Sequence, residues 1–559
     1  MRVLLTGAAG FVGEALLVEL LKSPTVELVL CLSRSAVRSA ATPEDGRVRW
    51  IHGDIRDTGW HDLVGRVDVV IHAAANASFG NDADHEAVNH GGTVLLLECA
   101  AKAGARHIVF LSTIGAVDRA PTNPIAQPLN TNSVPSPRSL YGQSKLRAER
   151  AVQASGIPCT IIRPAWVYGR GMRRGSHLSV LAAMVRRHSA VSVFDWPGRV
   201  SLVHVNDLCR AVAKIAIHGE CIGEIMYAAT ESVSLGKIFA TFGTAYGFRT
   251  AGAVPVPAVF GRGVVSRLHR ALPLTVANLF VDYLTCETHP FLKLIAPEGP
   301  LLFSTRYEDV LQTIDPLRKK WLITGAGSGI GRSLAHLLSR RGVQVIGVDR
   351  CFEDSAPLPI QRIVLDLTDR NAVSILRDIV ARDDVGVVVN NAGVGFKGAF
   401  SELCRKQIDA TFGVNMLFPV EFAHAIVPLL AQRRGSLVNV ASSMAGVPLP
   451  GMSLYSASKG FLQTWSIGLA EELRDTVQVL TVAPTGTRTN FQRHAGVRGG
   501  QRSLLSPDVV AKAIMDAVIQ GKSFRFIGSW PMRIALFAGG MLPLSMQTRL
   551  WGKLFGNLR

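Results

Sequence analysis

The chain has few charged residues and no closely paired cysteines. Asp, Glu, Lys and Arg make up only 18% of its 559 residues while hydrophobic residues make up 48%, which excludes a disordered protein. The eight cysteines are scattered, without a C-x-x-C pair. That pattern predicts no metal site and no disulfide framework, and it favours a reducing, cytoplasmic location.

Acidic residues are also scarce, because 42 Asp and Glu stand against 60 Lys and Arg, a formal net charge of +18. A basic surface attracts nucleic acid, but no RNP, helix-turn-helix or zinc-finger pattern accompanies the charge. We therefore expect no nucleic-acid partner. A membrane surface, or an anionic substrate such as a CoA thioester, fits the charge better.

No uninterrupted apolar run is long enough to cross a bilayer. The nearest one, Ile534–Thr548, lies in an apolar C-terminal segment at residues 531–559 and is interrupted by two glycines and a proline. Two interpretations of this segment stay open: peripheral contact with a membrane, and packing over an apolar substrate pocket.

The sequence contains an internal repeat. Residues 3–13 (VLLTGAAGFVG) and 321–331 (WLITGAGSGIG) each consist of a short apolar strand, a Thr-Gly turn and the start of a helix, and a second apolar strand follows both. This order is the βαβ start of a doubly wound parallel sheet. We predict an α/β chain of two tandem Rossmann-type domains, at residues 1–315 and 316–559, joined through a polar stretch around Pro316.

Each repeat contains three glycines at positions where a side chain would interfere with the turn, with cofactor binding or with helix packing. The first allows the tight turn, the second lets the backbone approach a pyrophosphate, and the third lets the helix pack closely on the sheet. Free N–H groups at the helix start then face the phosphates. The predicted cofactor-binding loops contain Gly7, Gly10, Phe11, Val12 and Gly13 in the first domain, and Gly325, Ser328, Gly329, Ile330 and Gly331 in the second.

The two glycine spacings, G-x-x-G-x-x-G and G-x-x-x-G-x-G, resemble the extended (epimerase/dehydratase-like) and classical branches of the short-chain dehydrogenase/reductase family. The resemblance covers residues 1 to about 230 and 320 to about 530. It implies an oxidoreductase that uses NAD or NADP on alcohol or carbonyl groups. It also implies a substrate cap in the C-terminal part of each domain, mostly at residues 231–311 and at 490–559.

The residue at the end of the second strand of each domain predicts which cofactor is bound. Asp349 favours NAD because its carboxylate repels a 2′-phosphate, although Arg350 follows it. Ser33 and Arg34 suit the 2′-phosphate of NADP in the first domain. The resemblance adds further cofactor-binding residues, namely Asp54, Asp366, Asn391 and Thr487.

A Tyr-x-x-x-Lys pair, Tyr455 and Lys459, places both side chains on one helical face of the second domain. A carbonyl that receives hydride needs a proton donor, and the lysine charge is expected to lower the tyrosine pKa. The resemblance implies that Asn415 helps to position the lysine and a relay water, and that a serine fixes the carbonyl oxygen. We assign Ser443, which fits the family's Ser-x-x-Gly pattern; Ser442 lies at the commoner distance from the tyrosine and stays the alternative.

Tyr141 and Lys145 repeat the pair in the first domain, with Thr113 as the expected hydroxyl donor and Ser112 beside it. Three further polar residues match fold-supporting motifs of the family better than a proton path, namely His72, His204 and Asp207.

The predicted function is that of a bifunctional enzyme acting on a hydrophobic substrate, such as a lipid, acyl-thioester, steroid or polyketide, because both expected caps are apolar. This places it in lipid metabolism. Two alternatives stay open: the first domain acts as an NDP-sugar epimerase or dehydratase, or one domain is a non-catalytic cofactor-binding scaffold. A homodimer is compatible with the family resemblance, and the sequence does not decide it.

Overall fold

The computed structural model divides the chain into two compact units, Met1–Leu311 and Gln312–Arg559. It describes residues 1–34, 45–77, 84–118, 128–172, 176–187, 189–196, 198–248, 251–256, 283–296, 298–352, 359–474, 476–489, 491, 504–530, 532–534, 538, 542–543 and 545–549. Most of the apolar segment 531–559 and part of the expected cap at 231–311 lie outside the described residues.

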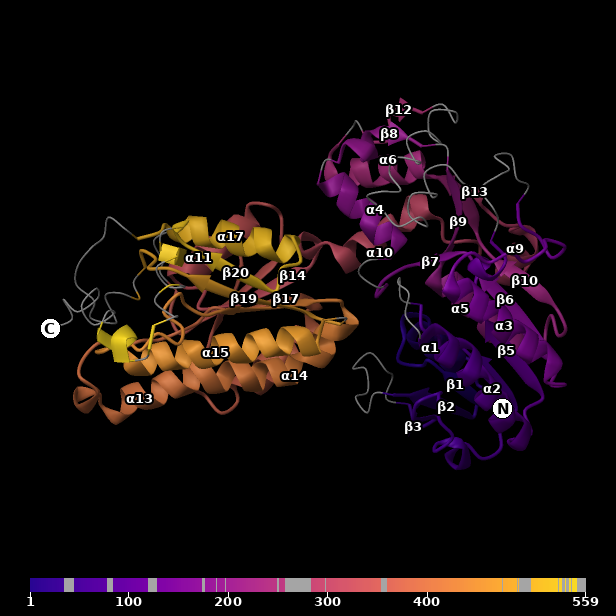
Figure 1. Cartoon of the computed structure of the whole chain (residues 1–559), viewed down its shortest axis with the longest axis horizontal. Coiled ribbons are helices and arrows are strands. Elements are labelled where there is room, and N and C mark those ends of the chain that lie inside the picture. Colours follow the sequence, from indigo (N-terminus) through magenta and orange to yellow (C-terminus); the bar gives the residue numbers. More distant parts are fainter. Residues whose placement is uncertain are drawn as a thin grey trace. The chain divides into compact units, whose positions relative to one another are not determined.

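The first unit is built on a seven-stranded parallel sheet in the order β10-β6-β5-β4-β1-β2-β3. The strand order reverses between β1 and β4, which is the crevice where doubly wound sheets bind ligands. Figure 1 shows α1 and α5 on one face and α2 and α3 on the other. The elements are β1 Arg2–Thr6, α1 Phe11–Leu21, β2 Leu28–Ser33, β3 Val48–His52, β4 Val69–His72, α2 Gly92–Lys102, β5 His107–Leu111, α3 Leu140–Ala154, β6 Cys159–Pro164, α5 Val205–His218 and β10 Ile225–Ala228.

A second, smaller sheet in this unit joins β11, β9 and β13, with β7 paired to β9. The expected cap at 231–311 is only part of this region, because residues 166–204 also contribute strands and a helix. Within the expected range, α9 belongs instead to the core that contains α1 and α5. The elements are β7 Trp166–Tyr168, α4 His177–Arg186, β8 Phe194–Asp195, β9 Arg199–His204, β11 Glu231–Ser234, α6 Leu235–Tyr246, β12 Val254–Pro255, β13 Tyr283–Leu284, α9 His289–Ile295 and α10 Phe303–Ile314.

The second unit repeats the plan with a seven-stranded parallel sheet in the order β16-β15-β14-β17-β18-β19-β20. In Figure 1, α11 and α17 lie on one face and α14 and α15 on the other. The elements are β14 Lys320–Thr324, α11 Gly329–Ser339, β15 Val345–Asp349, β16 Gln361–Val364, α12 Ala372–Arg382, β17 Val385–Asn390, α13 Arg405–Phe412, α14 Phe418–Gln432, β18 Ser436–Val440, α15 Ser453–Glu472, β19 Gln478–Pro484, α17 Pro507–Ile519 and β20 Phe524–Ile527. Both Rossmann-type sheets predicted from the sequence are therefore present.

The expected second cap at 490–559 differs from the structure. Residues 507–527 form α17 and β20, which complete the core: α17 packs against α11, and β20 pairs with β19 at the edge of the sheet. The apolar residues of this stretch, such as Ile514 and Val518, are buried in that core rather than in a cap. Apolar patterning alone does not separate these two destinations.

One helical run in the part of the chain that the structure describes, Arg405–Gln432, is long and apolar enough to cross a membrane. It covers α13, a π-helical turn and α14. Phe422, Ile426 and Leu430 in this run are fully buried against the second sheet. A core helix passes the same test of length and composition, and these contacts account for the buried apolar residues, whereas Phe412 and Leu417 are exposed.

Two glycines in α15 give a matched test of how tightly this helix is packed. A Cβ on Gly460 would lie 2.8 Å from the backbone nitrogen of Gly446, whereas one on Gly468 would meet nothing within 4 Å. We expect Gly460→Ala to lower the free energy of unfolding by about 1–3 kcal/mol through overpacking. Gly468→Ala should raise it by about 0.5–1 kcal/mol through helix propensity. Denaturant unfolding of the two variants checks this, and equal effects would contradict it.

Candidate active sites

Both glycine loops have the geometry expected for a dinucleotide. Gly7 and Gly325 adopt left-handed φ values of 71° and 68° directly after β1 and β14. A Cβ on Gly13 would lie 2.0 Å from the carbonyl oxygen of Gly7, and one on Gly331 equally close to that of Gly325. The third glycine therefore lets the helix begin against the turn, as predicted, and leaves its first N–H groups facing the crevice.

The other loop residues occupy the helix starts. Gly10 and Ser328 are the N-cap residues of α1 and α11, and neither makes a side-chain cap. Gly329 has a left-handed φ of 53°, so its conformation alone favours glycine. The remaining predicted residues lie in the first helical turns: Phe11 and Val12 in α1, and Ile330 in α11.

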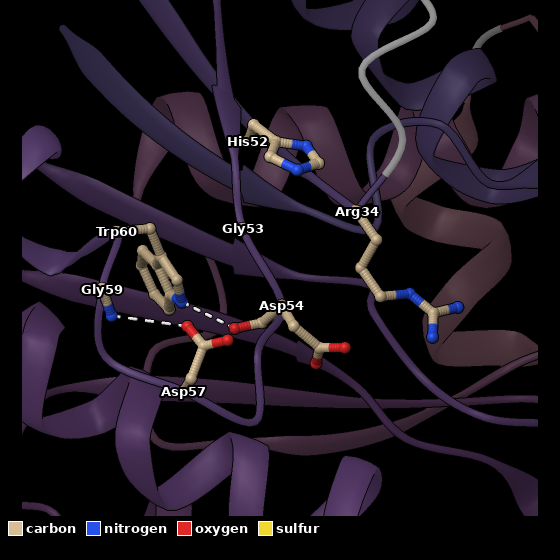
Figure 2. A pocket seen from close by; sticks show the side chains of 7 residues that line it. All are labelled: Arg34, His52, Gly53, Asp54, Asp57, Gly59 and Trp60. Carbon is tan, nitrogen blue, oxygen red and sulfur yellow. Dashed lines mark hydrogen bonds between the residues drawn. The ribbon is translucent and has the colours of Figure 1, made fainter.

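Arg34 and Asp54 line one cavity of about 410 Å³ at the carboxyl ends of β2 and β3. Figure 2 shows both side chains on one side of the backbone at Gly53, with Trp60 on the other. The Asp54 carboxylate is hydrogen-bonded by Arg56, which holds the pKa of Asp54 below its usual range. Trp60 donates its indole N–H to the Asp54 carbonyl oxygen at 2.8 Å, and this bond ties Trp60 to the loop after β3.

In the second unit, the Asp349 carboxylate accepts a hydrogen bond from the backbone N–H of Gly327 in the glycine loop, at 2.8 Å. The Asp349 carboxylate therefore lies beside the glycine loop, at the position where the adenosine ribose of a dinucleotide would bind. Asp366 follows β16 and accepts hydrogen bonds from the backbone and the hydroxyl of Thr368. Burial raises the pKa of Asp366, and these bonds lower it more, so that its net pKa is below the ordinary value.

The loops after β17 and β19 place the last two predicted cofactor residues. The Asn391 side chain donates to the carbonyl oxygens of Thr324 and Gly325 at 3.0 and 3.1 Å, which ties the glycine turn to the loop after β17. The Thr487 hydroxyl donates to the Thr485 carbonyl oxygen at 2.9 Å. These loops, the glycine turns and Asp349 fit a dinucleotide laid across the switch point of the sheet.

The Tyr455 hydroxyl is hydrogen-bonded to Ser442 and not to Ser443. Burial raises the pKa of Tyr455 and the bond with Ser442 lowers it only in part. The net shift is opposite to the one expected from the lysine charge. Ser443 instead has a buried hydroxyl without a hydrogen-bond partner among the described residues.

Ser442 therefore replaces Ser443 in our assignment, and the first unit supports the change. Ser442 is the second residue after β18 and accepts a hydrogen bond from the Met444 N–H at 3.1 Å. Thr113 is the second residue after β5 and accepts one from the Gly115 N–H at 3.2 Å. The family's Ser-x-x-Gly pattern favours Ser443, whereas the position after the strand favours Ser442, the serine that interacts with Tyr455.

Lys459 is buried, and its ammonium group donates to the Val440 carbonyl oxygen at 3.0 Å. A Cβ on Gly393 would lie 3.0 Å from the Lys459 nitrogen, so the lysine ammonium lies close against the backbone of the loop after β17. Burial lowers the pKa of Lys459 to about 8.

Asn415 lies in a π-helical turn, Gly413–Leu417, and is fully buried. Its amide accepts from the Val394 N–H at 2.9 Å and donates to the Val394 carbonyl oxygen at 2.8 Å. It also donates to the Ser458 hydroxyl at 2.9 Å, and Ser458 in turn donates to the Tyr455 carbonyl oxygen. Asn415 thus connects the loop after β17 to the helix that carries the tyrosine and the lysine.

The first unit contains the same circuit around Asn89, in the π-helical turn Glu86–Gly91, a residue to which the sequence analysis assigned no role. The Asn89 amide exchanges two hydrogen bonds with the Asn76 backbone at 2.7 and 3.0 Å. It also donates to Ser144, whose hydroxyl donates to the Tyr141 carbonyl oxygen. The sequence signal that could have found it was Asn-x-x-Gly-Thr, which the Asn415 region does not repeat.

Tyr141 is hydrogen-bonded to Thr113, as the sequence predicts for these two residues. Burial raises the pKa of Tyr141 to about 12 despite this bond. The Lys145 ammonium lies 4.2 Å from the centroid of the Phe110 ring. Burial lowers the pKa of Lys145 to about 7, and the Glu149 carboxylate opposes this shift.

Glu149, one helical turn beyond Lys145, is a second residue that sequence reasoning missed. It accepts the Ser112 hydroxyl at 2.5 Å and both Nε and Nη2 of Arg163, at 2.9 and 2.7 Å. Arg163 also donates to the Tyr227 hydroxyl at 3.2 Å. Because Glu149 holds the Ser112 hydroxyl, Thr113 is left as the hydroxyl beside Tyr141.

The two histidines considered in the sequence analysis are fixed inside the fold. His72 bridges the hydroxyls of Thr6 and Thr93 at 2.7 and 2.9 Å, and burial holds its pKa well below the usual range. His204 contacts the Asp309 carboxylate at 3.1 Å. Asp207 is also buried, and it contacts Arg210 and the backbone N–H of Leu301.

Comparison with known families matches each unit separately. A family model described as short chain dehydrogenase matches residues 319–497. A second one, described as the NAD dependent epimerase/dehydratase family, matches residues 3–226.

Individual relatives match one unit at a time. The putative oxidoreductase SadH of Mycobacterium tuberculosis is 30% identical over 234 residues, which cover 37% of this chain and 85% of SadH. The 17-beta-hydroxysteroid dehydrogenase type 3 of Danio rerio is 33% identical over 193 residues, 31% of this chain and 63% of that protein. Among solved structures, MoeE5 in complex with UDP-glucose and NAD is 21% identical, covers 55% of this chain and 97% of that chain, and has a TM-score of 0.44.

The serine assignment can be tested in a chain whose first acid is removed by Tyr141→Phe. We expect Ser442→Ala to lower kcat/KM of the remaining site about 100-fold, since a hydroxyl aimed at the reacting oxygen is lost. Ser443→Ala should change it less than about tenfold. Steady-state kinetics with any ketone that the site reduces gives the answer, and a larger loss in Ser443→Ala would restore the original assignment.

The two lysines predict different pH limits. A lysine is cationic below its pKa, so a rate that needs the ammonium falls as pH rises through that value. The kcat/KM of the first site should fall above pH about 7 and that of the second above pH about 8. Profiles of kcat/KM against pH for the Tyr455→Phe chain report the first site, and those for the Tyr141→Phe chain report the second. A decrease over the same pH range in both variants would contradict the prediction.

Proposed function

Because the chain belongs to the short-chain dehydrogenase/reductase superfamily, with an epimerase/dehydratase-type unit followed by a short-chain dehydrogenase unit, we propose that it is a bifunctional enzyme that transfers hydride at two sites on a hydrophobic substrate. Oxidoreductase chemistry with NAD(P) is common to both types of unit. Beyond this shared chemistry, we propose that the substrate is apolar, that both units are active and that the two units prefer different cofactors.

The observation that carries the apolar substrate is the cluster around Tyr455. Leu449 and Met452 are buried together, and Tyr455 and Phe491 pack against them. The rings of Tyr455 and Phe491 have centroids 5.3 Å apart. A Cβ on Gly395 would lie 2.6 Å from the Phe491 ring, so the loop after β17 also closes on it. A proton donor bordered by such side chains suits a carbonyl with apolar substituents.

The residues divide the chemistry in a simple way. Tyr455 stays protonated at neutral pH because burial raises its pKa, so it can donate a proton to a carbonyl oxygen. Ser442 would hold that oxygen beside the tyrosine hydroxyl. The nicotinamide cofactor supplies or accepts the hydride when it is bound in the crevice of the sheet. Tyr141 and Thr113 have the same arrangement in the first unit.

The cofactor preferences follow from the ends of β2 and β15. Arg34 offers a guanidinium group to a 2′-phosphate, which supports NADP in the first unit. Asp349 offers a carboxylate beside the glycine loop, which supports NAD in the second.

Two further parts of the proposal concern the surroundings of the enzyme. The name of the Danio rerio relative refers to a hydroxysteroid, an apolar secondary alcohol, and this supports substrates of that kind for the second unit. Peripheral membrane contact through residues 531–559, a cytoplasmic location and a homodimer remain predictions, and most of that segment lies outside the described residues.

A cofactor-consumption screen tests the proposal. The full chain, Tyr141→Phe and Tyr455→Phe are supplied with NADPH or NADH and with aliphatic ketones, keto-steroids, acyl-CoA thioesters or NDP-sugars. We expect turnover of apolar carbonyl compounds, with each variant losing about 100-fold or more of the activity of one site. Turnover of NDP-sugars alone would overturn the substrate assignment. A variant that changes no activity would identify its unit as a scaffold.

A further inference from the structure

The helix of the first Tyr-x-x-x-Lys pair carries a buried carboxylate that the proposed chemistry does not use. Glu149 lies four residues after Lys145 in α3, so both side chains are on one face of the helix. Each of the two residues is 1% exposed. In Figure 1, α3 lies along β5 and β6, and apolar residues of all three elements share one core. Glu149 and Lys145 are therefore enclosed between the helix and the sheet.

The Glu149 carboxylate is held in place by donors from the sheet side. The Ser112 hydroxyl donates to it at 2.5 Å from the end of β5, and the Arg163 guanidinium donates to it twice from β6. Arg163 also donates to Tyr227 on β10, whose pKa is raised by burial. Helical side chains lean toward the N-terminus of their helix, which for Glu149 is the direction of Lys145.

The other titratable groups that surround this lysine are neutral at pH 7. Burial holds the pKa of His72 on β4 well below its usual range. Burial raises the pKa of Tyr141 to about 12. Among the described residues, the charges in this part of the core are therefore the two cations Lys145 and Arg163 and the single anion Glu149. Without the carboxylate, two buried cations would stand unopposed.

The two sites differ in how much help their lysine needs. In the second site, burial leaves the pKa of Lys459 at about 8, and the position four residues further holds the neutral Gln463. In the first site, burial lowers the pKa of Lys145 to about 7 although Glu149 opposes the shift. The lysine that burial affects more strongly is thus the one that has a carboxylate beside it.

We propose that Glu149 is a positioning residue of the first site, which acts by keeping the buried Lys145 in its charged ammonium form. This inference rests on the proposed hydride transfer in the first unit and adds a residue to that site. An opposite charge within about 4–6 Å shifts a pKa by about one to three units. Removal of the carboxylate therefore makes the lysine lose its proton at a lower pH.

The test compares profiles of kcat/KM against pH for the first site in Tyr455→Phe chains, with any ketone that the site reduces. Glu149→Gln keeps the size of the side chain and removes its charge, whereas Glu149→Asp keeps the charge and shortens the side chain. We expect the decrease at high pH to move about one unit lower in Glu149→Gln, and less than half as far in Glu149→Asp. His85 lies beside Tyr141 in every variant and does not distinguish them.

A matched control is Tyr227→Phe, which removes a hydroxyl from the same hydrogen-bond network and leaves every charge in place. Its profile should coincide with that of the parent chain. Equal displacements in Glu149→Gln and Glu149→Asp, or no displacement in Glu149→Gln, would overturn the inference, because the residue would then act through packing alone.

Glu149→Gln leaves Arg163 without its buried partner, and such a change can prevent folding. The variant that combines Glu149→Gln with Arg163→Met removes both charges and contains no unpaired buried guanidinium. Its decrease at high pH should also move to lower pH, since the lysine again lacks the carboxylate. A profile identical to that of the parent chain would overturn the inference.

A measurement that needs no turnover separates this inference from the proposed function. Glu149→Gln should lower the unfolding temperature of the full chain more at pH 6 than at pH 9, because only the ammonium form of Lys145 gains from the carboxylate. In a Lys145→Met background the two decreases should be equal. If the Tyr455→Phe chain turns over no substrate, the activity proposed for the first unit fails, and this difference still supports the role of Glu149. Equal decreases at both pH values in the chain with Lys145 would overturn that role.

Discussion

A single buried asparagine amide connects the helix of each Tyr-x-x-x-Lys pair to a neighbouring loop. Asn89 and Asn415 each exchange two hydrogen bonds with one backbone residue of the loop after the strand beside the switch point. Each also donates to the serine three residues after the tyrosine of the Tyr-x-x-x-Lys pair. An amide bonded on every side leaves little freedom to either partner, and its removal would leave several buried polar groups unsatisfied, at about 1–3 kcal/mol each. This loop and the helix with the Tyr-x-x-x-Lys pair therefore keep one relative position in each unit.

The two sites share this frame and differ in what surrounds the lysine and tyrosine. Lys145 has a buried carboxylate, Glu149, four residues along its helix, and Arg163 compensates that charge from β6. The corresponding position after Lys459 is the neutral Gln463. Tyr141 packs beside His85, whereas Tyr455 packs beside Phe491. The fusion thus joins two sites with the same arrangement of reacting groups and different electrostatics, as expected of two relatives from separate branches.

The sequence was sufficient where local geometry decides the outcome. A glycine-rich turn between a strand and a helix predicts its own backbone conformation, and Tyr-x-x-x-Lys places both groups on one helical face. It was insufficient where distant segments meet. Ser442 and Ser443 are adjacent, and only the path of the chain after β18 decides which one reaches Tyr455. Asn89 and Glu149 look like ordinary polar helix residues until their partners on other strands are known. The stretch 507–527 was assigned to a cap because burial in a core and burial in a pocket produce the same apolar pattern.

The helix α10 crosses the division between the units at Leu311 and Gln312. Its first residue, Phe303, packs edge-on against Tyr168 and Phe242, and its Asp309 contacts His204. Anyone who wishes to produce the first domain alone would therefore lose part of its packing by ending the gene fragment before this helix is complete. A fragment must extend beyond Asp309 to retain these contacts, and one that keeps Phe303–Ile314 whole also retains the buried Leu311 and Thr313 of the last turn.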